Sequence, residues 1–230
     1  MVYAIADVHG CYDKYQAMLE NIRFCDDDIL YVLGDVIDRG PDGVRILRDM
    51  MLRPNVIPLL GNHEFMAAMC LPWLLAEITE KSLAKLDQAH VGAFRDWMNN
   101  GGGPTLRALG ALSQEERQDI LDYLREFSLY EEVEVNGHAF VLVHAGLKNF
   151  SPEKPLENYA LEELLFSRPG PDTAYWPGRT VICGHTPTWY LGDDAGRIVR
   201  RDTWIGIDCG CGSGGPLGCL CLDTMGEFYV

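Results

Sequence analysis

One local pattern recurs five times in this sequence: a short apolar run ends in a loop that contains Gly together with His, Asp or Asn. Apolar runs of this length, bounded by Gly and polar residues, are typical of buried strands. Helical patterns separate the first three runs, which predicts βαβ units and a largely parallel sheet. The loops would then meet outside the carboxyl ends of the strands, where such sheets bind ligands. The five runs are residues 2–6, 29–33, 56–60, 140–143 and 180–183.

Residues from about 65 to 130 have a different pattern, which is mostly helical. Ser113 followed by Glu116 predicts a capping box at a helix start, and apolar residues then recur at helical spacing. Gly101–Pro104 predicts a break between helices. Because the strand pattern resumes afterwards, we interpret this segment as a helical insertion within one domain that spans residues 1–230. Part of it is expected to border the loop of His63.

Three further local signals refine the expected fold. Pro41 suits the first turn of a helix whose apolar face would be Val44, Leu47 and Met51. Asn136-Gly137, between Glu132–Val135 and His138–Val143, is a strong hairpin signal. A turn near Asp193–Gly196 predicts antiparallel strands towards the C-terminus.

Composition excludes several classes of protein. The chain has 230 residues, 47% of them hydrophobic, and a formal net charge of −15. Broad nucleic-acid binding needs many Lys and Arg side chains, so it is not expected. The longest apolar stretch, residues 65–76, contains Pro72 and is shorter than the roughly 20 residues of a membrane span. With no leader pattern at the N-terminus, we expect a cytoplasmic protein without a membrane partner.

The chain contains eight Cys, which at this size are expected to be reduced thiols. Four of them form two Cys-x-Cys pairs: Cys209, Cys211, Cys219 and Cys221. A structural zinc site is the alternative, but its usual spacing is Cys-x₂₋₄-Cys. Spacing of two on predicted strands favours small apolar side chains that point into a core.

The five loops carry the chemistry. Four of the six His residues follow directly after a predicted strand, beside Asp or Asn side chains. Carboxylate, imidazole and amide ligands suit divalent ions at hydrolytic sites. Two ions that share one carboxylate form a two-metal site, at which a bound water can ionise near neutral pH and attack phosphorus.

The ordered motifs resemble those of the metallophosphoesterase superfamily and cover residues 7–186. The Asp-Arg-Gly ending of the second motif resembles the phosphoprotein phosphatases, a family that also includes symmetrical diadenosine tetraphosphate hydrolases. Length and spacing are most similar to the small bacterial and bacteriophage-type Ser/Thr protein phosphatases. The motifs are Asp7-x-His9-Gly10, Gly34-Asp35-x-x-Asp38-Arg39-Gly40, Gly61-Asn62-His63-Glu64, His144-Ala145-Gly146 and Gly184-His185-Thr186. Ala6 and Ala145 stand where many members have Gly.

The resemblance implies an α/β fold, a calcineurin-like sandwich of mixed sheets flanked by helices, and a role for each motif residue. Asp35 would bridge two divalent ions, expected to be Mn²⁺, with Fe, Zn or other ions as alternatives. His63, oriented by Asp38, would be the general acid. Arg39, Asn62 and Arg168 would contact the substrate phosphate. The implied metal ligands are Asp7, His9, Asp35, Asn62, His144 and His185.

Three functions remain open at the level of the sequence. The first is a metal-dependent phosphatase that acts on Ser/Thr phosphoproteins or on another phosphorylated substrate. The second is a dinucleoside polyphosphate hydrolase with the same metal ions. The third is a silent binding scaffold, which the complete ligand set with His63 and Arg39 disfavours. The stretch Trp97–Gly102 resembles one near the substrate cleft of phage-type members.

Overall fold

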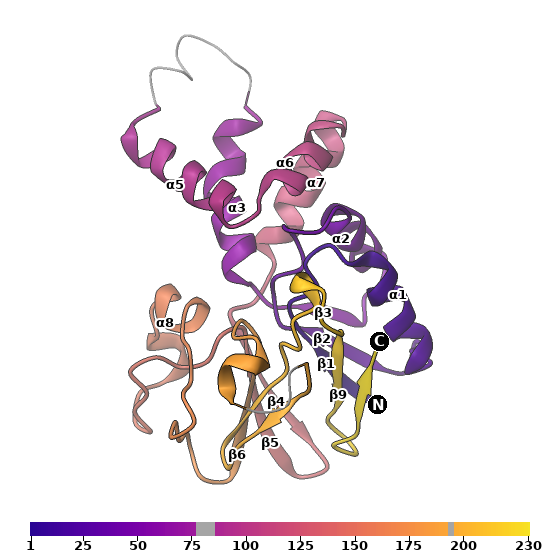
Figure 1. Ribbon diagram of the computed structural model, residues 1–230, viewed down its shortest axis with the longest axis vertical. Helices are drawn as coiled ribbons and strands as arrows, with labels where there is room; N and C mark the ends of the chain where they lie inside the picture. The colour runs from indigo at the N-terminus through magenta and orange to yellow at the C-terminus, as the bar shows by residue number, and fades with distance from the viewer. Residues whose placement is uncertain (77–85, 193–195) are drawn as a thin grey trace.

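The computed structural model describes residues 1–76, 86–192 and 196–230, so part of the turn predicted near Asp193–Gly196 lies outside the described residues (Figure 1). The elements in the first half are β1 (Val2–Ile5), α1 (Tyr12–Asn21), β2 (Ile29–Val32), α2 (Gly43–Met51), β3 (Val56–Pro58), α3 (Asn62–Leu74), α5 (Gln88–Asn99), α6 (Gly103–Gly110) and α7 (Gln114–Arg125). The elements that follow are β4 (Tyr130–Val135), β5 (His138–Val143), η1 (Leu156–Asn158), α8 (Leu161–Leu165), β6 (Arg179–Cys183), η2 (Thr188–Leu191), β7 (Val199–Arg200), β8 (Trp204–Gly206), η3 (Cys211–Ser213), β9 (Gly218–Cys221) and β10 (Glu227–Tyr229).

The strands form two five-stranded mixed sheets, in the orders β10-β9-β1-β2-β3 and β4-β5-β6-β8-β7. Strands β1, β2 and β3 are parallel, as predicted, and so are β5, β6 and β8. The expectation that one sheet gathers all five loops is wrong, because the loops after β1, β2 and β3 belong to the first sheet and those after β5 and β6 to the second. The predicted α/β sandwich of mixed sheets flanked by helices is confirmed.

Side chains alternate between the two faces of each strand, and this alternation explains which hydrophobic core each of them enters. In β1, Tyr3 and Ile5 pack into the core beneath the helices, whereas Ala4 faces the core between the two sheets. In β5, Phe140 and Leu142 enter that shared core. Their neighbours along the strand face a third core that includes Leu164 of α8. Each sheet therefore buries both faces, which accounts for the continuous apolar runs in the sequence.

The predicted helical insertion contains the later part of α3, all of α5, α6 and α7, and these helices extend away from the sheets (Figure 1). Ser113 caps α7 and exchanges hydrogen bonds with Glu116, as predicted. The break predicted at Gly101–Pro104 is shorter than expected, since α6 already begins at Gly103 with Pro104 in its first turn, where no amide donor is needed.

Two local predictions have different outcomes. Asn136 and Gly137 both have positive φ, 53° and 78°, and connect β4 to β5 as a hairpin. The apolar face predicted for α2 is wrong at Met51, which is 39% exposed, whereas Met50 is 1% exposed. The other two predicted positions, Val44 and Leu47, are buried as expected, so the apolar face of α2 ends with Met50 instead of Met51.

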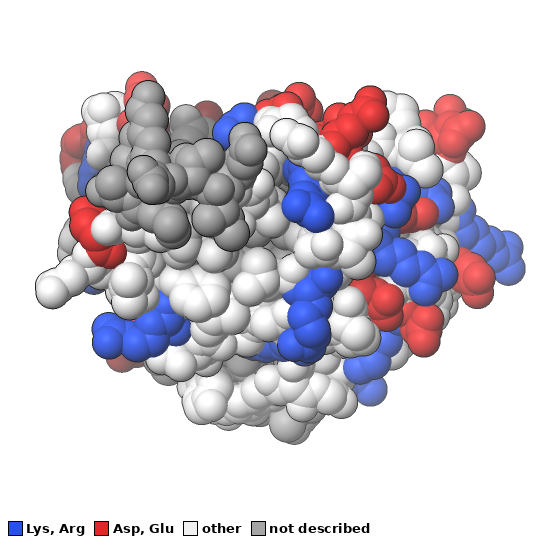
Figure 2. Space-filling model, turned by 90° about the horizontal axis from the view of Figure 1, so that it is seen from above, with Lys and Arg blue, Asp and Glu red and all other residues white. Residues whose placement is uncertain are grey.

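The outer face above the insertion has mixed charge. Acidic and basic side chains are interspersed there beside a wide area with neither (Figure 2). Nucleic-acid-binding faces instead gather Lys and Arg into a patch. Among the described residues, no helix combines the length and apolarity that crossing a membrane requires.

Candidate active site

The five predicted loops meet at one end of the two sheets. Their backbones are locally unusual, since non-Gly residues with positive φ are rare and cluster at functional sites. Close contacts explain the flanking glycines: a Cβ on Gly184 would collide with the Asp7 carboxylate, and one on Gly61 would collide with Asp35. The predicted site residues with positive φ are Asp7, His9, Asp35, Asp38, Arg39 and His185.

Asp35 lies at the centre of the site and is 1% exposed. Its Oδ2 is 3.6 Å from His9 Nε2, and its Oδ1 is 3.6 Å from His144 Nε2. The backbone N–H of His63, in the first turn of α3, donates a 3.0 Å hydrogen bond to Oδ1. The two carboxylate oxygens of Asp35 therefore face two different groups of candidate ligands.

One group of candidate ligands joins Asp35 to Asn62, His144 and His185. Asn62 Oδ1 lies 2.9 Å from His144 Nε2 and 2.9 Å from His185 Nδ1. His144 Nδ1 lies 2.7 Å from the Leu33 carbonyl, which can only accept, so Nδ1 is the donor and Nε2 of the neutral ring carries a lone pair. An amide oxygen and a lone-pair nitrogen at this separation repel each other, and a cation bound to both would remove the repulsion.

The other group contains His9, Asp35 and His63, whose ligand atoms lie within 4.8 Å of one another. His9 Nδ1 donates a 2.9 Å hydrogen bond to the Ile37 carbonyl and leaves Nε2 directed at Asp35. Such a bond fixes the tautomer of a metal-binding histidine. Burial lowers the pKa values of His9 and His185 to about 3, so both rings are neutral and can act as ligands.

Asp7 lies beside these groups and accepts a 2.9 Å hydrogen bond from the His185 backbone N–H. Burial raises its pKa well above the usual value, and the nearby Asp208 and Asp35 raise it further. Burial likewise raises the pKa of Asp208 to about 7, and Asp35 adds to that effect, although the Gly210 N–H bond opposes it. Three carboxylates that are each at most 3% exposed thus share one small volume.

This donor set fits two divalent cations. Like charges buried together are costly unless cations or protons compensate them. Neutral imidazoles, carboxylates and an amide oxygen are suitable ligands for ions of the Mn, Fe, Zn or Mg type. The residues that could hold the ions are those predicted from the sequence: Asp7, His9, Asp35, Asn62, His144 and His185.

His63 and Asp38 form a buried pair next to the candidate metal ligands. His63 Nδ1 donates a 2.8 Å hydrogen bond to Asp38 Oδ2, and its Nε2 lies 3.2 Å from Arg39 Nη2. Burial alone would lower the pKa of His63, but Asp35 and Asp38 outweigh it and raise the pKa. A histidine with a raised pKa and a fixed tautomer is suited to donate a proton from Nε2.

The helical insertion holds Asp38 and Arg39 in place. Trp97 Nε1 donates a 2.8 Å hydrogen bond to Asp38 Oδ2, and Thr105 Oγ1 donates a 2.6 Å bond to Oδ1. The backbone N–H of Arg39 donates to the Gly101 carbonyl at 2.9 Å. The expectation that the insertion borders the site is confirmed. Trp97 and Gly101 belong to the stretch that the resemblance implied to be near the cleft, whereas no sequence pattern indicated Thr105.

Arg168 extends from the segment after α8 towards the same end of the sheets. Its Nη1 lies 3.5 Å from the hydroxyl of Thr186, the residue that follows His185. Both Arg39 and Arg168 counteract the burial that raises the pKa of Asp208. The two exposed guanidinium groups therefore flank the buried carboxylates and face a substrate that approaches from solvent.

Two further buried carboxylates, Asp208 and Glu64, lie at the site but are not among the residues predicted from the sequence. Asp208 follows β8 and could have been found by the same signal as the other loops, since an apolar run there ends in Asp-Cys-Gly. Glu64 accepts hydrogen bonds from the backbone N–H groups of Asp35, Val36 and Ile37 at 2.8–3.1 Å. Nothing in the sequence pattern indicated those contacts.

The four C-terminal cysteines lie in two separate cores. Cys219 and Cys221 point from β9 into the core beneath the helices, as predicted, whereas Cys209 faces the core between the sheets. Cys209 and Cys211 are not on strands, contrary to expectation: Cys211 begins η3. Because the four thiols do not converge, core packing accounts for them better than a shared zinc ion.

Several known proteins are similar to this chain in sequence. A bis(5'-nucleosyl)-tetraphosphatase, symmetrical, from Acidovorax sp. (strain JS42) is 33% identical over 172 residues, which are 73% of this chain and 52% of that protein. The asymmetrical bis(5'-nucleosyl)-tetraphosphatase PrpE of Halalkalibacterium halodurans is 26% identical and covers 94% of this chain and 87% of its own length. The chain spans about half the length of the first curated relative, and less of the next two.

Solved structures are similar in fold. One provisionally described as a diadenosine tetraphosphatase has a TM-score of 0.66 at 18% identity and covers 100% of this chain and 92% of its own. A Saccharomyces cerevisiae protein serine/threonine phosphatase has a TM-score of 0.57 at 15% identity, covering 95% and 71%. The family model described as calcineurin-like phosphoesterase matches residues 1–200. The chain therefore belongs to the calcineurin-like phosphoesterase family and is a metallophosphoesterase.

Proposed function

We propose that this chain hydrolyses dinucleoside tetraphosphates at a two-metal site. The observation that carries the reaction class is Asp35, whose two carboxylate oxygens face different groups of candidate ligands. The substrate class is supported by the relatives, among which proteins named bis(5'-nucleosyl)-tetraphosphatase match up to 94% of the chain. The same relatives favour this substrate over the Ser/Thr phosphoproteins expected first from the sequence.

The resident ions would be held by the six ligands named above, and we propose Mn²⁺ as the metal. When bound, two divalent ions supply Lewis-acid stabilisation of the charge that develops on the transferred phosphoryl group. Asn62 would also lie close to the substrate phosphate. The remaining steps fall to side chains of the chain itself.

Arg39 and Arg168 would bind the phosphate oxygens, because a guanidinium presents a planar pair of donors that matches them. Both are exposed at the rim of the site, where an incoming polyphosphate first meets the protein. His63 would donate the proton at Nε2 to the leaving oxygen, while Asp38 keeps Nδ1–H in place. A departing nucleotide phosphate is a better leaving group than a serine alkoxide. Hydrolysis of the proposed substrate therefore depends less on proton donation by His63.

The test is a comparison of kcat/KM for diadenosine tetraphosphate, a phosphothreonine peptide and an aryl phosphate in excess Mn²⁺. We expect the dinucleotide to be the best substrate by at least about 10-fold. A phosphopeptide that exceeds it by that factor would overturn the proposal in favour of a Ser/Thr protein phosphatase. Product analysis distinguishes two molecules of ADP from ATP plus AMP. Activity that is restored by Zn²⁺ or Fe²⁺ but not by Mn²⁺ would contradict the metal assignment.

A further inference from the structure

A cavity of about 550 Å³ lies beside the arginine side of the active site. Its walls include Phe150, Phe166, Arg168, Ala174 and Tyr175, and we refer to it as the side pocket. The volume is within the range of sites that bind small molecules. None of the roles proposed above for the metal ligands or for His63 uses this space.

The side pocket is continuous with the site through two residues. Arg168 lines the pocket, and its guanidinium reaches the Thr186 hydroxyl next to His185. The Phe166 ring meets the His185 ring edge to face, with centroids 6.3 Å apart. A substrate phosphate held by Arg168 would therefore place its next covalently attached group at the mouth of the pocket.

The walls suit a flat aromatic ligand. Phe166 lines the pocket and is 41% exposed, so its ring is accessible to a ligand there. Phe150 packs edge to face on Tyr175 with centroids 5.1 Å apart, so this wall is already rigid. Tyr175 is further held because its hydroxyl accepts a 3.1 Å hydrogen bond from the Leu147 N–H. Nucleobases stack on such rings with little regard to base identity.

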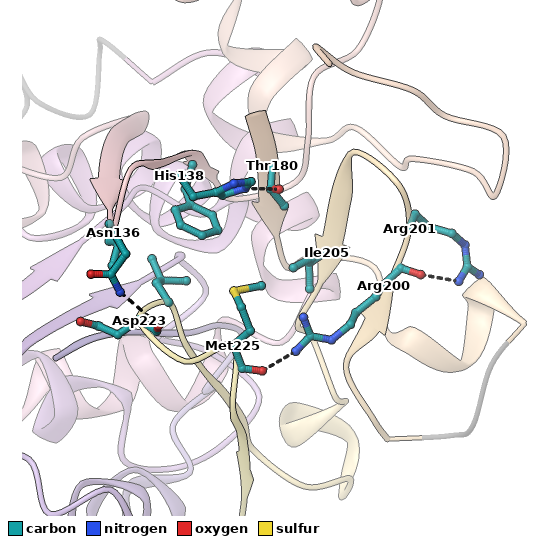
Figure 3. A pocket seen from close by; sticks show the side chains of 11 residues that line it. Asn136, His138, Thr180, Arg200, Arg201, Ile205, Asp223 and Met225 are labelled. Carbon is teal, nitrogen blue, oxygen red and sulfur yellow. Dashed lines mark hydrogen bonds between the residues drawn. The ribbon is translucent and has the colours of Figure 1, made fainter. Parts of the chain in front are cut away.

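A second cavity, of about 450 Å³, lacks this combination. Figure 3 shows the Arg200 guanidinium turned to the Met225 carbonyl and His138 turned to Thr180. Arg200 also pairs with Glu227 at 2.8 Å. The polar groups drawn there already bind one another, whereas Arg168 has an exposed guanidinium next to the reacting centre.

We infer that the side pocket binds a nucleoside of the substrate, the one attached to the phosphate that Arg168 holds. This inference rests on the proposed function and extends it from the phosphate to the part of the substrate beyond it. Stacking on the exposed Phe166 ring would recognise the base by shape and leave its identity open. The site would then favour nucleotide esters over phosphopeptides, which carry no flat ring at that position.

Two variants test the pocket, one that removes a wall and one that fills the space. Phe166→Ala and Ala174→Trp are each expected to lower the ratio of kcat/KM for diadenosine tetraphosphate to that for glycerol 2-phosphate, which carries no ring, by about 10-fold, mainly through KM. Leu161→Ala is the matched control, since Leu161 is also exposed on this side of the fold but does not line the pocket. Ratios in both variants that equal the control would overturn the inference.

An inhibition measurement separates this inference from the proposed function. AMP and ribose 5-phosphate carry the same phosphate and sugar, and only AMP carries a base. As competitive inhibitors of aryl phosphate hydrolysis, AMP is expected to bind about 10-fold more tightly to the wild type and to lose this advantage in Phe166→Ala. If the wild type does not cleave diadenosine tetraphosphate, the proposed function fails, but this comparison still shows whether the side pocket binds a nucleoside. Equal inhibition of the wild type by AMP and ribose 5-phosphate would overturn the inference about the side pocket.

Discussion

Thr105 Oγ1 donates a 2.6 Å hydrogen bond to Asp38 Oδ1 and so joins the helical insertion to the loop after β2. The same hydroxyl accepts a 3.0 Å hydrogen bond from the Asp38 backbone N–H. The other carboxylate oxygen is shared by His63 and Trp97. The insertion thus sets the position of the carboxylate that orients His63.

Thr105→Val keeps the shape of the side chain but leaves a buried carboxylate oxygen and an N–H without their partner. We expect a loss of unfolding free energy of about 1–3 kcal/mol and a larger fall in kcat for alkyl than for aryl phosphates. Thr105→Ser, which restores the hydroxyl, should recover most of both losses. Denaturant unfolding and the two substrate series provide the measurements. An equal fall in kcat for both series would mean that Thr105 supports the fold alone.

Trp97→Phe removes the second donor to Asp38, and Trp73→Phe is its matched control. Trp73 also lies in the helical insertion, but its Nε1 donates to the Met69 carbonyl at the surface. Only Trp97→Phe should change the dependence of kcat on the leaving group, measured over a series of phosphate esters. The same change in both variants would attribute the effect to general loosening of the insertion.

Glu64→Gln should destabilise the protein more than a typical surface substitution. The buried carboxylate accepts four backbone N–H groups, and the amide nitrogen of Gln would turn a donor towards some of them. Hydrogen bonds to charged groups contribute about 1.5–3 kcal/mol each, so a loss of at least about 3 kcal/mol is expected. Because burial raises the pKa of Glu64 to about 7, urea unfolding is measured above that pH, where the carboxylate is ionised. Glu116→Gln at the exposed cap of α7 is the control, with a loss below about 1 kcal/mol. Equal losses would contradict the proposed role of Glu64.

Asp35→Asn should reduce the metal content below two equivalents per chain, because one carboxylate faces both groups of ligands. The measurement is metal analysis after dialysis against a fixed free Mn²⁺ concentration. Asp26→Asn, an exposed change of the same kind, should retain the full content. Two tightly held ions in Asp35→Asn would refute a bridging position.

His63→Asn should remove the proton donor while leaving in place the six residues proposed to hold the ions. We expect losses of about 10²–10⁴-fold in kcat for alkyl phosphates, whose leaving group must be protonated, and much smaller losses for activated aryl phosphates. His138→Asn changes a histidine outside the site and should affect neither. Equal losses on both substrate classes would argue against general acid catalysis.

The pH dependence of kcat tests the pair formed by His63 and Asp38. The pKa of His63 is raised by Asp35 and Asp38 against the effect of burial, so its proton is retained below about pH 6.5 and is lost only as the pH rises through the raised value. Activity that needs this proton should therefore fall on the alkaline side. Asp38→Asn removes one of the raising charges and should move the alkaline limb to lower pH, by about one unit. If the alkaline limb of the pH profile does not move, a group other than His63 determines it.

Much of this architecture follows from local sequence because its causes are local. Apolar runs with Gly-rich ends produced the buried strands and their loops, and Asn136-Gly137 adopts the positive φ that a tight hairpin needs. Ser113 caps its helix through a residue three positions away. The loops after the strands also identified the candidate ligands, since equivalent strand ends converge in any such fold.

Other features arise only when distant segments pack together. Asp38 meets Trp97 and Thr105 across 59 and 67 positions, and no local pattern encodes which residues of a helix will reach a buried carboxylate. The division of the strands into two sheets likewise depends on which strand edges pair. Because of this division, the candidate ligands come from loops of both sheets. The sequence, through its loop motifs and the family they resemble, indicated which side chains could bind metal and phosphate. Tertiary packing decided what holds them and that an aromatic pocket opens beside Arg168, because both depend on contacts between residues far apart in the chain.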